Sequence, residues 1–159
     1  MNARLLRLRA EIGSDRAALV SRLDELESIT LAPSQADPGD VARAAVALHH
    51  AYSAFETMML RLAREFDGEP QPGPDWHQAL LDAMALDIDG VRPRAVSAES
   101  HAALQALLAF RHFFRHAYAA ALDPARLEPL RASAVVARGP LMRDLDAVDA
   151  FLAGLAGGP

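Results

Sequence analysis

The chain has 159 residues, a length typical of one domain. Hydrophobic residues make up 52% and charged residues 23%, which is enough apolar material for a core and excludes a wholly disordered chain. It contains no cysteine, which excludes disulfides, cysteine-ligated metal sites and a catalytic thiol. The net charge is −5 and all 16 basic residues are arginine, so any nucleic-acid contact must come from a local patch.

The first residues, MNARLLRLRAEIGSDR, carry a charge every few positions and lack the apolar core of a signal peptide. No window approaches the roughly 20 apolar residues that a membrane span requires. We therefore expect a cytoplasmic protein that makes no membrane contact.

Two long amphipathic helices are predicted in the first 66 residues. The first covers about 2–30, with Gly13 as a weak point where the helix could break. A loop follows over 31–39, and Asp37-Pro38 is typical of a cap and first helical position. The apolar positions that set these two helices are Leu5, Leu8, Ile12, Leu19, Leu23, Leu26, Ile29, then Val41, Ala45, Leu48, Tyr52, Phe55, Met59, Leu62 and Phe66.

Breaker-rich loops separate the remaining elements. After the loop 67–75, Asp75 can cap a short helix that includes Trp76, Leu80, Leu81 and Met84. After the loop 89–96, Ser97 can cap a third long helix that runs to about residue 122.

A last helix is predicted after Asp123-Pro124. Its apolar stripe comprises Leu127, Leu130, Leu141, Leu145, Val148, Leu152 and Leu155. Pro129 and Pro140 lie inside this pattern and are expected to kink or interrupt the helix.

No segment shows the alternation of a strand. The sequence therefore predicts an all-α, up-down bundle of four long helices and one short helix. We expect a single domain over 1–155 and a frayed tail over 156–159. This fold class does not identify a function.

One stretch of the third long helix, FRHFFRHAY, brings together side chains that can bind an anion or transfer a proton. On a helical wheel with Arg111 at zero, Arg115 lies at about 40° and Tyr118 at about −20°, while His112 and His116 lie at about 100° and 140°. Phe110, Phe114 and Leu107 point the other way. Two arginines and two histidines within one and a half turns favour an anionic ligand.

No acidic residue lies between Ser100 and Leu122 to neutralise this cluster. Leu104 and Leu108 continue the same face, which would leave apolar surface beside the cations. A subunit interface would cover that surface. Arginine and histidine around a phosphate suit metal-free RNA cleavage, in which a histidine moves a proton at the ribose 2′-OH or the leaving oxygen. The sequence leaves open which histidine is the acid and which the base.

The residues Arg111-x4-His116-x-Tyr118 resemble the R-x4-6-H signature of HEPN ribonucleases and, more closely, the R-x4-H-x-Y form of the HepT-like toxins. The segments HHAYSAFETMMLRLAREF, DWHQALLDAM and LDPARL are also similar to this family. The resemblance covers most of the chain.

The resemblance implies a HEPN helical bundle that forms a homodimer, with the two motifs meeting in a cleft. It implies the toxin of a type VII-like HEPN/MNT toxin–antitoxin module that cleaves RNA, such as tRNA or mRNA, without a metal or other cofactor. Arg111 and His116 would be catalytic, with His112 and Arg115 assisting phosphate binding. A cognate minimal nucleotidyltransferase antitoxin would neutralise the toxin by adding AMP to Tyr118.

Other interpretations stay open at this point. The domain could be a non-catalytic interaction module that binds a partner nucleotidyltransferase. His112 and His116, four residues apart, could hold a metal, although no third ligand is evident and adjacent arginines would repel a cation. We interpret Trp76 as a packing residue, His49 and His50 as partly exposed or interface residues, and Glu25, Glu27, Glu56 and Glu65 as solvated.

Overall fold

The computed structural model describes residues 2–32, 34–116 and 122–157. These residues form five helices and no strand: α1 Ala3–Ser28, α2 Pro38–Phe66, α3 Trp76–Met84, α4 Ala98–His116 and α5 Pro124–Ala156. The only strand-like pairing among them is an isolated bridge between Ile88 and Arg92. The predicted all-α bundle of four long helices and one short helix is confirmed.

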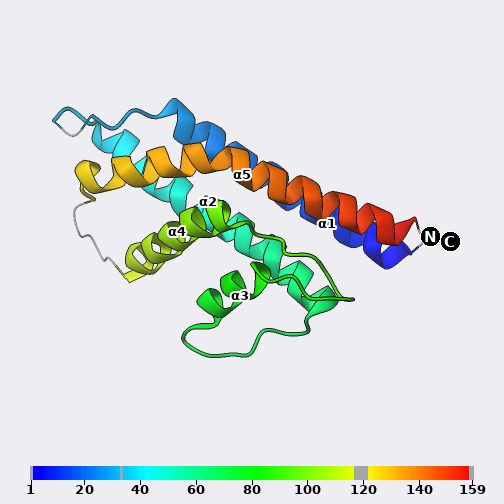
Figure 1. Cartoon of the computed structure of the whole chain (residues 1–159). Helices are drawn as coiled ribbons and strands as arrows, with labels where there is room; N and C mark the ends of the chain where they lie inside the picture. The colour runs from blue at the N-terminus through cyan, green and yellow to red at the C-terminus, as the bar shows by residue number, and fades with distance from the viewer. Residues whose placement is uncertain (1, 33, 117–121, 158–159) are drawn as a thin grey trace.

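The long helices run alternately up and down (Figure 1). α1 and α5 lie side by side as an antiparallel pair, and the backbone N–H of Asn2 donates to the carbonyl of Ala156 at 3.3 Å. α2 packs against α1 and α4, and the short α3 packs against α2 and α4 only. α2 therefore connects the α1–α5 pair with α3 and α4.

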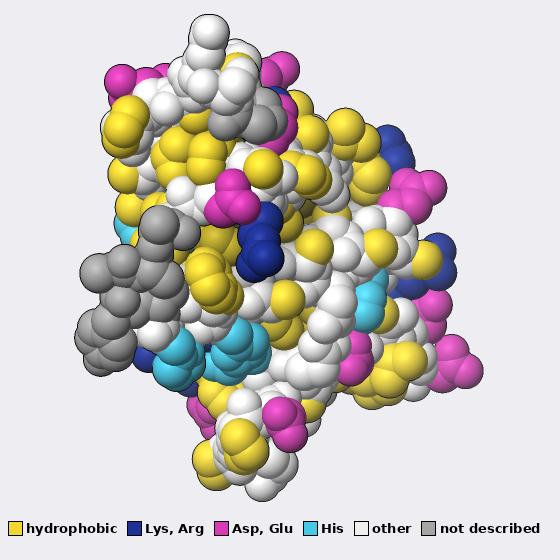
Figure 2. All heavy atoms as spheres, turned by 90° about the vertical axis from the view of Figure 1, so that its left-hand side faces the viewer, with side chains coloured by type: hydrophobic (Ala, Val, Ile, Leu, Met, Phe, Trp, Pro, Cys, Tyr) yellow, Lys and Arg dark blue, Asp and Glu magenta, His cyan; other side chains and the backbone are white. Residues whose placement is uncertain are grey.

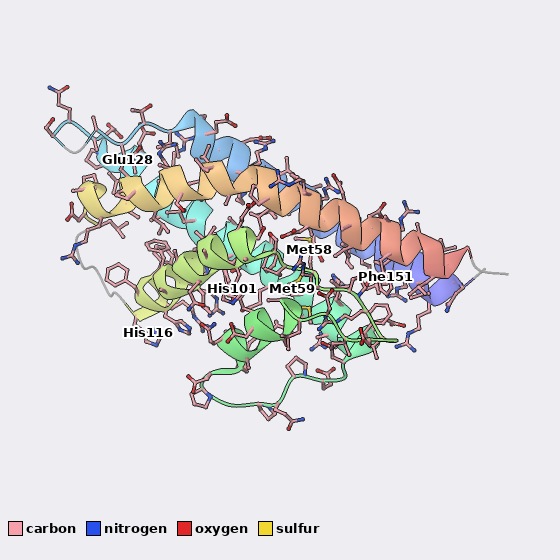
Figure 3. All side chains as sticks on the ribbon, in the orientation of Figure 1. Met58, Met59, His101, His116, Glu128 and Phe151 are labelled. Carbon is pink, nitrogen blue, oxygen red and sulfur yellow. The ribbon has the colours of Figure 1, made fainter. Side chains whose placement is uncertain are left out.

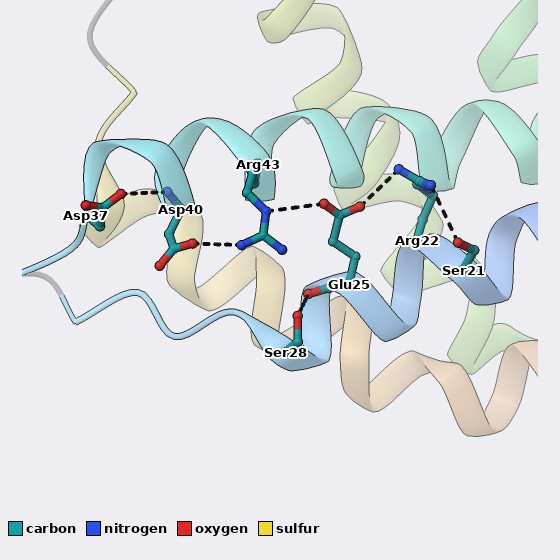
Figure 4. A network of polar contacts seen from close by, with 7 residues as sticks. All are labelled: Ser21, Arg22, Glu25, Ser28, Asp37, Asp40 and Arg43. Carbon is teal, nitrogen blue, oxygen red and sulfur yellow. Dashed lines mark hydrogen bonds and ion pairs between the residues drawn. The ribbon is translucent and has the colours of Figure 1, made fainter.

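Three of the long helices begin with a side-chain cap, at Asn2, Asp37 and Asp123, whereas the expected cap of the short helix is wrong, because the side chain of Asp75 makes no hydrogen bond to the first turn of α3. The side chain of Asn2 accepts from the backbone N–H of Arg4 and Leu5, and that of Asp37 accepts from Gly39 and Asp40 (Figure 4). Pro38 occupies the start of α2, as Asp37-Pro38 predicted. α1 continues through Gly13 without a break.

The core follows the predicted apolar stripes. All six stripe residues within α1, Ile29 directly after it, and the stripe residues of α2 up to Leu62 are buried. Met58 and Met59 lie centrally within the bundle (Figure 3). Two expectations are wrong: Leu155 is exposed, and Leu104 and Leu108 are buried in the core, so they leave no apolar surface beside the cationic cluster.

The expected interruption of the last helix does not occur. α5 includes Pro129 and Pro140 and continues to Ala156. Each proline removes the donor to the carbonyl four residues earlier, which belongs to Ala125 or Val136. Both of those residues are exposed, so water can replace the missing donor.

Polar contacts fix α3 in place. The buried Arg92 pairs with Asp67 at 2.6 and 2.8 Å and donates to the carbonyls of Ala83 and Leu86. On the other side of α3, the amides of Gln78 and Gln105 exchange hydrogen bonds at 2.6 and 2.7 Å. The position of α3 matters because this helix carries His77.

No described helix combines the length and the apolar character needed to cross a bilayer.

Candidate functional site

The last two turns of α4 carry four of the five predicted site residues. His112, Arg115 and His116 are exposed, and His116 lies at the C-terminal end of α4 (Figure 3). Tyr118 lies outside the described residues. Arg111 differs from the prediction, because its side chain is only 11% exposed. The helical wheel placed it on the open face, whereas α2 and α3 cover it.

Two residues from other helices enclose Arg111. Glu56 of α2 and His77 of α3 have side chains that are only 9% and 10% exposed. A guanidinium nitrogen of Arg111 lies 3.3 Å from Nε2 of His77, and another lies 3.9 Å from Oε1 of Glu56. The interpretation of Glu56 as a solvated residue is therefore wrong. Its carboxylate supplies the negative charge that α4 lacks beyond Glu99 in its first turn.

The contacts of His77 determine which of its ring nitrogens carries hydrogen. Nε2 faces the guanidinium of Arg111, which can only donate, so Nε2 must accept. Nδ1 therefore carries the hydrogen and donates to Oε2 of Glu56 at 2.5 Å. The ring of Trp76 lies against His77 with a centroid distance of 3.7 Å. Trp76 is also packed against the core, as expected for a packing residue.

The surroundings of Glu56 include one more buried polar group, the hydroxyl of Tyr52. Burial first, then the charge of Glu56 and a hydrogen bond to it, raise the pKa of Tyr52, while Arg111 acts in the opposite direction. Tyr52 therefore stays a neutral donor to Glu56. Nε of Arg111 is also buried, and no described residue accepts a hydrogen bond from it.

The two histidines of the motif have distinct environments. Nδ1 of His116 lies 2.7 Å from the backbone carbonyl of His112 and must donate to it. Nε2 of His116 is then the ring nitrogen left to accept or transfer a proton. Burial, followed by the charges of His77, Arg111 and His116, lowers the pKa of His112, and Glu56 opposes this shift. This lowered pKa favours the neutral form of His112.

His49 of α2 borders the same cluster. Its ring lies 5.2 Å from that of Phe114 and 5.5 Å from that of His50. Burial, His50, Arg111 and Arg115 lower the pKa of His49. The environment of His49 is therefore set by both α2 and α4, and its partial burial agrees with the expectation.

The open part of the cluster remains cationic. In the part of the chain that the structure describes, no carboxylate lies within ion-pair distance of Arg115. Arg115 and the two exposed histidines of α4 can therefore meet an anion directly. Arg111 already has a counter-charge in Glu56, so the argument that the arginines require an anionic ligand holds for Arg115 alone.

A metal centre finds no support in this geometry. Among the described residues, no group of three or more histidine or acidic side chains could hold a metal ion. His116 also directs one ring nitrogen to a backbone carbonyl.

A mainly apolar pocket of about 320 Å³ lies between the end of α4 and the start of α5. It is lined by Phe110, Phe113, Leu122, Asp123, Arg126 and Leu127. Figure 2 shows this end of the molecule, with histidine side chains beside hydrophobic ones. None of the four polar motif residues on the described part of α4 lines the pocket.

Glu56 and His77 are the site residues that the sequence interpretation missed. A signal for both was present in the apolar register. Glu56 lies four residues after Tyr52 and three before Met59, inside the stripe of α2. His77 lies three and four residues before Leu80 and Leu81. A titratable side chain on a core-facing position implies a buried partner.

The fold and the site together define an all-α bundle with an arginine and histidine cluster at the end of its fourth helix. A comparison with protein families matches residues 43–152 to the family described as "HepT-like protein". The match includes α3, α4 and most of α2 and α5, and the chain belongs to this family, part of the HEPN superfamily. No curated protein and no solved structure matches the chain.

Proposed function

We propose that the protein is a metal-independent endoribonuclease that acts as the toxin of a HEPN/MNT toxin–antitoxin pair. The observation that carries the proposal is the arrangement at the end of α4. Arg115, His112 and His116 are exposed together beside the oriented guanidinium of Arg111. Family membership supports it, because the family match includes the whole R-x4-H-x-Y segment.

In the proposed reaction, the ribose 2′-oxygen attacks the adjacent phosphorus and the bond to the 5′-oxygen breaks. The products are a 2′,3′-cyclic phosphate and a free 5′-hydroxyl. One base takes the proton of the 2′-OH, and one acid gives a proton to the leaving 5′-oxygen. Nε2 of His116 is suited to such a transfer because Nδ1 is bonded to the carbonyl of His112. Arginine stabilises the charge that develops on the phosphate.

A homodimer completes this scheme. If two motifs face each other in a cleft, each protomer supplies one His116, so one can act as base and the other as acid. The neutral His112 and the cation of Arg115 would hold the phosphate. An antitoxin nucleotidyltransferase that adds AMP to Tyr118, two residues beyond His116, would place bulk and negative charge next to the site. Both would keep RNA phosphate away.

Expression of the wild type, His116→Ala and His101→Ala tests the proposal. His101 lies on the same helix but pairs with Asp82 at 2.7 Å, away from the motif, so it is a matched control. We expect growth arrest and new RNA fragments from the wild type and the control, and neither from His116→Ala. Purified dimer should cleave RNA in the presence of EDTA and leave cyclic phosphate ends.

One observation favours the alternative of a non-catalytic interaction module. Arg111 is largely buried and already paired with Glu56, as a structural arginine would be. This alternative predicts intact RNA with the wild type, after intact mass has excluded AMP on Tyr118. It also predicts that Arg115→Ala weakens binding to a nucleotidyltransferase partner.

A further inference from the structure

Three polar side chains from three helices meet where the bundle would otherwise be apolar. Glu56, His77 and Arg111 belong to α2, α3 and α4, and each keeps about a tenth of its exposure. Arg111 lies three residues after Leu108 and four after Leu107, both of which are buried. All three residues therefore occupy core-facing positions of their own helices.

The hydrogen bonds of this cluster run in one direction, from Arg111 through His77 to Glu56. Arg111 donates to Nε2 of His77 at 3.3 Å, and Nδ1 of His77 donates to Glu56 at 2.5 Å. Oε1 of Glu56 lies 3.9 Å from a second nitrogen of Arg111. A planar guanidinium that is held from two directions loses most of its rotational freedom.

We propose that Glu56 and His77 are positioning residues, which hold Arg111 in a single orientation for RNA cleavage. This inference rests on the proposed function. Glu56 and His77 need not touch RNA. Their effect is transmitted through the guanidinium of Arg111, and through His112, whose ring lies edge-on to that of His77 at 5.7 Å.

The same arrangement gives Arg111 and Arg115 different roles in the proposed reaction. The carboxylate of Glu56 offsets the charge of Arg111, so Arg111 adds little long-range attraction for RNA. Arg115, which has no described carboxylate within ion-pair distance, provides that attraction. Loss of positioning should therefore lower kcat, whereas loss of Arg115 should raise KM.

The test uses purified full-length protein and a short single-stranded RNA that the wild type cleaves. Glu56→Gln keeps the size of the side chain and removes its charge. We expect kcat to fall on the order of 100-fold, as displacement of a reacting group by about 1 Å can cause. KM should stay unchanged or decrease, because the charge of Arg111 is no longer offset. His77→Phe, which removes both ring nitrogens, should lower kcat similarly.

Glu65→Gln is the matched control. Glu65 lies on the same helix and is partly buried, and it pairs with Arg4 at 2.8 Å at the far end of α2. This variant should keep kcat and KM within about twofold of the wild type. A purely structural role of Glu56 would instead lower kcat in proportion to the folded fraction, with KM unchanged, and cooling would restore it. Wild-type kinetics of Glu56→Gln, or such a restoration, would overturn the positioning role.

Nitrogen NMR of the imidazole rings gives a readout that does not depend on activity. His77 should carry hydrogen on Nδ1 and none on Nε2, the nitrogen that faces the guanidinium of Arg111. A ring with hydrogen on Nε2, or on both nitrogens, would contradict the hydrogen bonds proposed from Arg111 through His77 to Glu56. If the wild type cleaves no RNA, the proposed function fails. If it cleaves RNA and Glu56→Gln cleaves equally well, only the positioning role fails.

Discussion

Two of the arginine–carboxylate contacts in this molecule lie in contrasting settings. Between α1 and α2, Glu25 bridges Arg22 at 3.0 Å and Arg43 at 3.5 Å (Figure 4), and all three side chains are at least one quarter exposed. Among α2, α3 and α4, Glu56 and Arg111 are about nine-tenths buried.

The difference concerns what each contact can contribute. An exposed pair gives about 0–1 kcal/mol, because water competes for both partners and salt screens them. A buried pair costs desolvation and is strongly destabilising once one partner is lost. The α1–α2 ion pairs therefore add little to the stability of a hydrophobic helix interface. The Glu56–His77–Arg111 cluster instead fixes the geometry of a site.

The largest effect is expected from Arg111→Ala. This change leaves the carboxylate of Glu56 buried beside an apolar core without its cation. We expect a loss of about 3 kcal/mol in the free energy of unfolding. Urea denaturation followed by circular dichroism measures it. Arg111→Ala combined with Glu56→Gln should recover part of the loss, and an additive double variant would contradict the coupling.

A smaller loss is expected from Tyr52→Phe. The change removes one hydrogen bond to Glu56 and preserves the shape of a fully buried ring. The cost should be about 1 kcal/mol in the free energy of unfolding. An unchanged urea midpoint would show that the hydroxyl does not support the buried carboxylate.

The free energy of unfolding should also depend on pH, because of the partly buried His49. Burial and the charges of His50, Arg111 and Arg115 lower the pKa of His49 in the folded protein, and Glu56 opposes them. The unfolded chain, with a histidine pKa of about 6.5, then binds more protons between the two values. The stability should therefore decrease as the pH falls below about 6.5.

Melting curves between pH 7.5 and 5 measure this dependence. The melting temperature of His49→Gln should vary less between these pH values than that of the wild type. His101→Ala, a change at the partly exposed histidine that pairs with Asp82, serves as the comparison. An identical pH dependence of the wild type and His49→Gln would exclude His49 as a cause.

The smallest effect is expected from a change at the exposed ion pairs between α1 and α2. Arg43→Ala removes two ion pairs, with Glu25 at 3.5 Å and with Asp40 at 3.0 Å, and every partner is at least one quarter exposed. The free energy of unfolding should change by about 0.5 kcal/mol or less, and the change should shrink further in 1 M salt. A loss comparable to that of Arg111→Ala would remove the distinction between the two regions.

The helices and the core were predictable because both depend on local patterns. Apolar residues at intervals of three and four define a buried face, and Asn2, Asp37 and Ser97 cap helices through contacts within three residues. The interruption expected at Pro129 and Pro140 was wrong, because the carbonyls that lose a donor belong to exposed residues. Solvent exposure of a backbone group is a property of the fold.

The sequence alone placed Arg111, His112, Arg115 and His116 together, since all four belong to two turns of one helix. It also determined the helical class and the family resemblance that the family comparison confirms. The environment of Arg111 was decided only by tertiary structure. Glu56 and His77 lie 55 and 34 positions earlier in the chain, and the α2–α3 loop and the clamp of Arg92 bring them to α4. A helical wheel describes one helix, whereas burial and charge compensation depend on the helices packed against it.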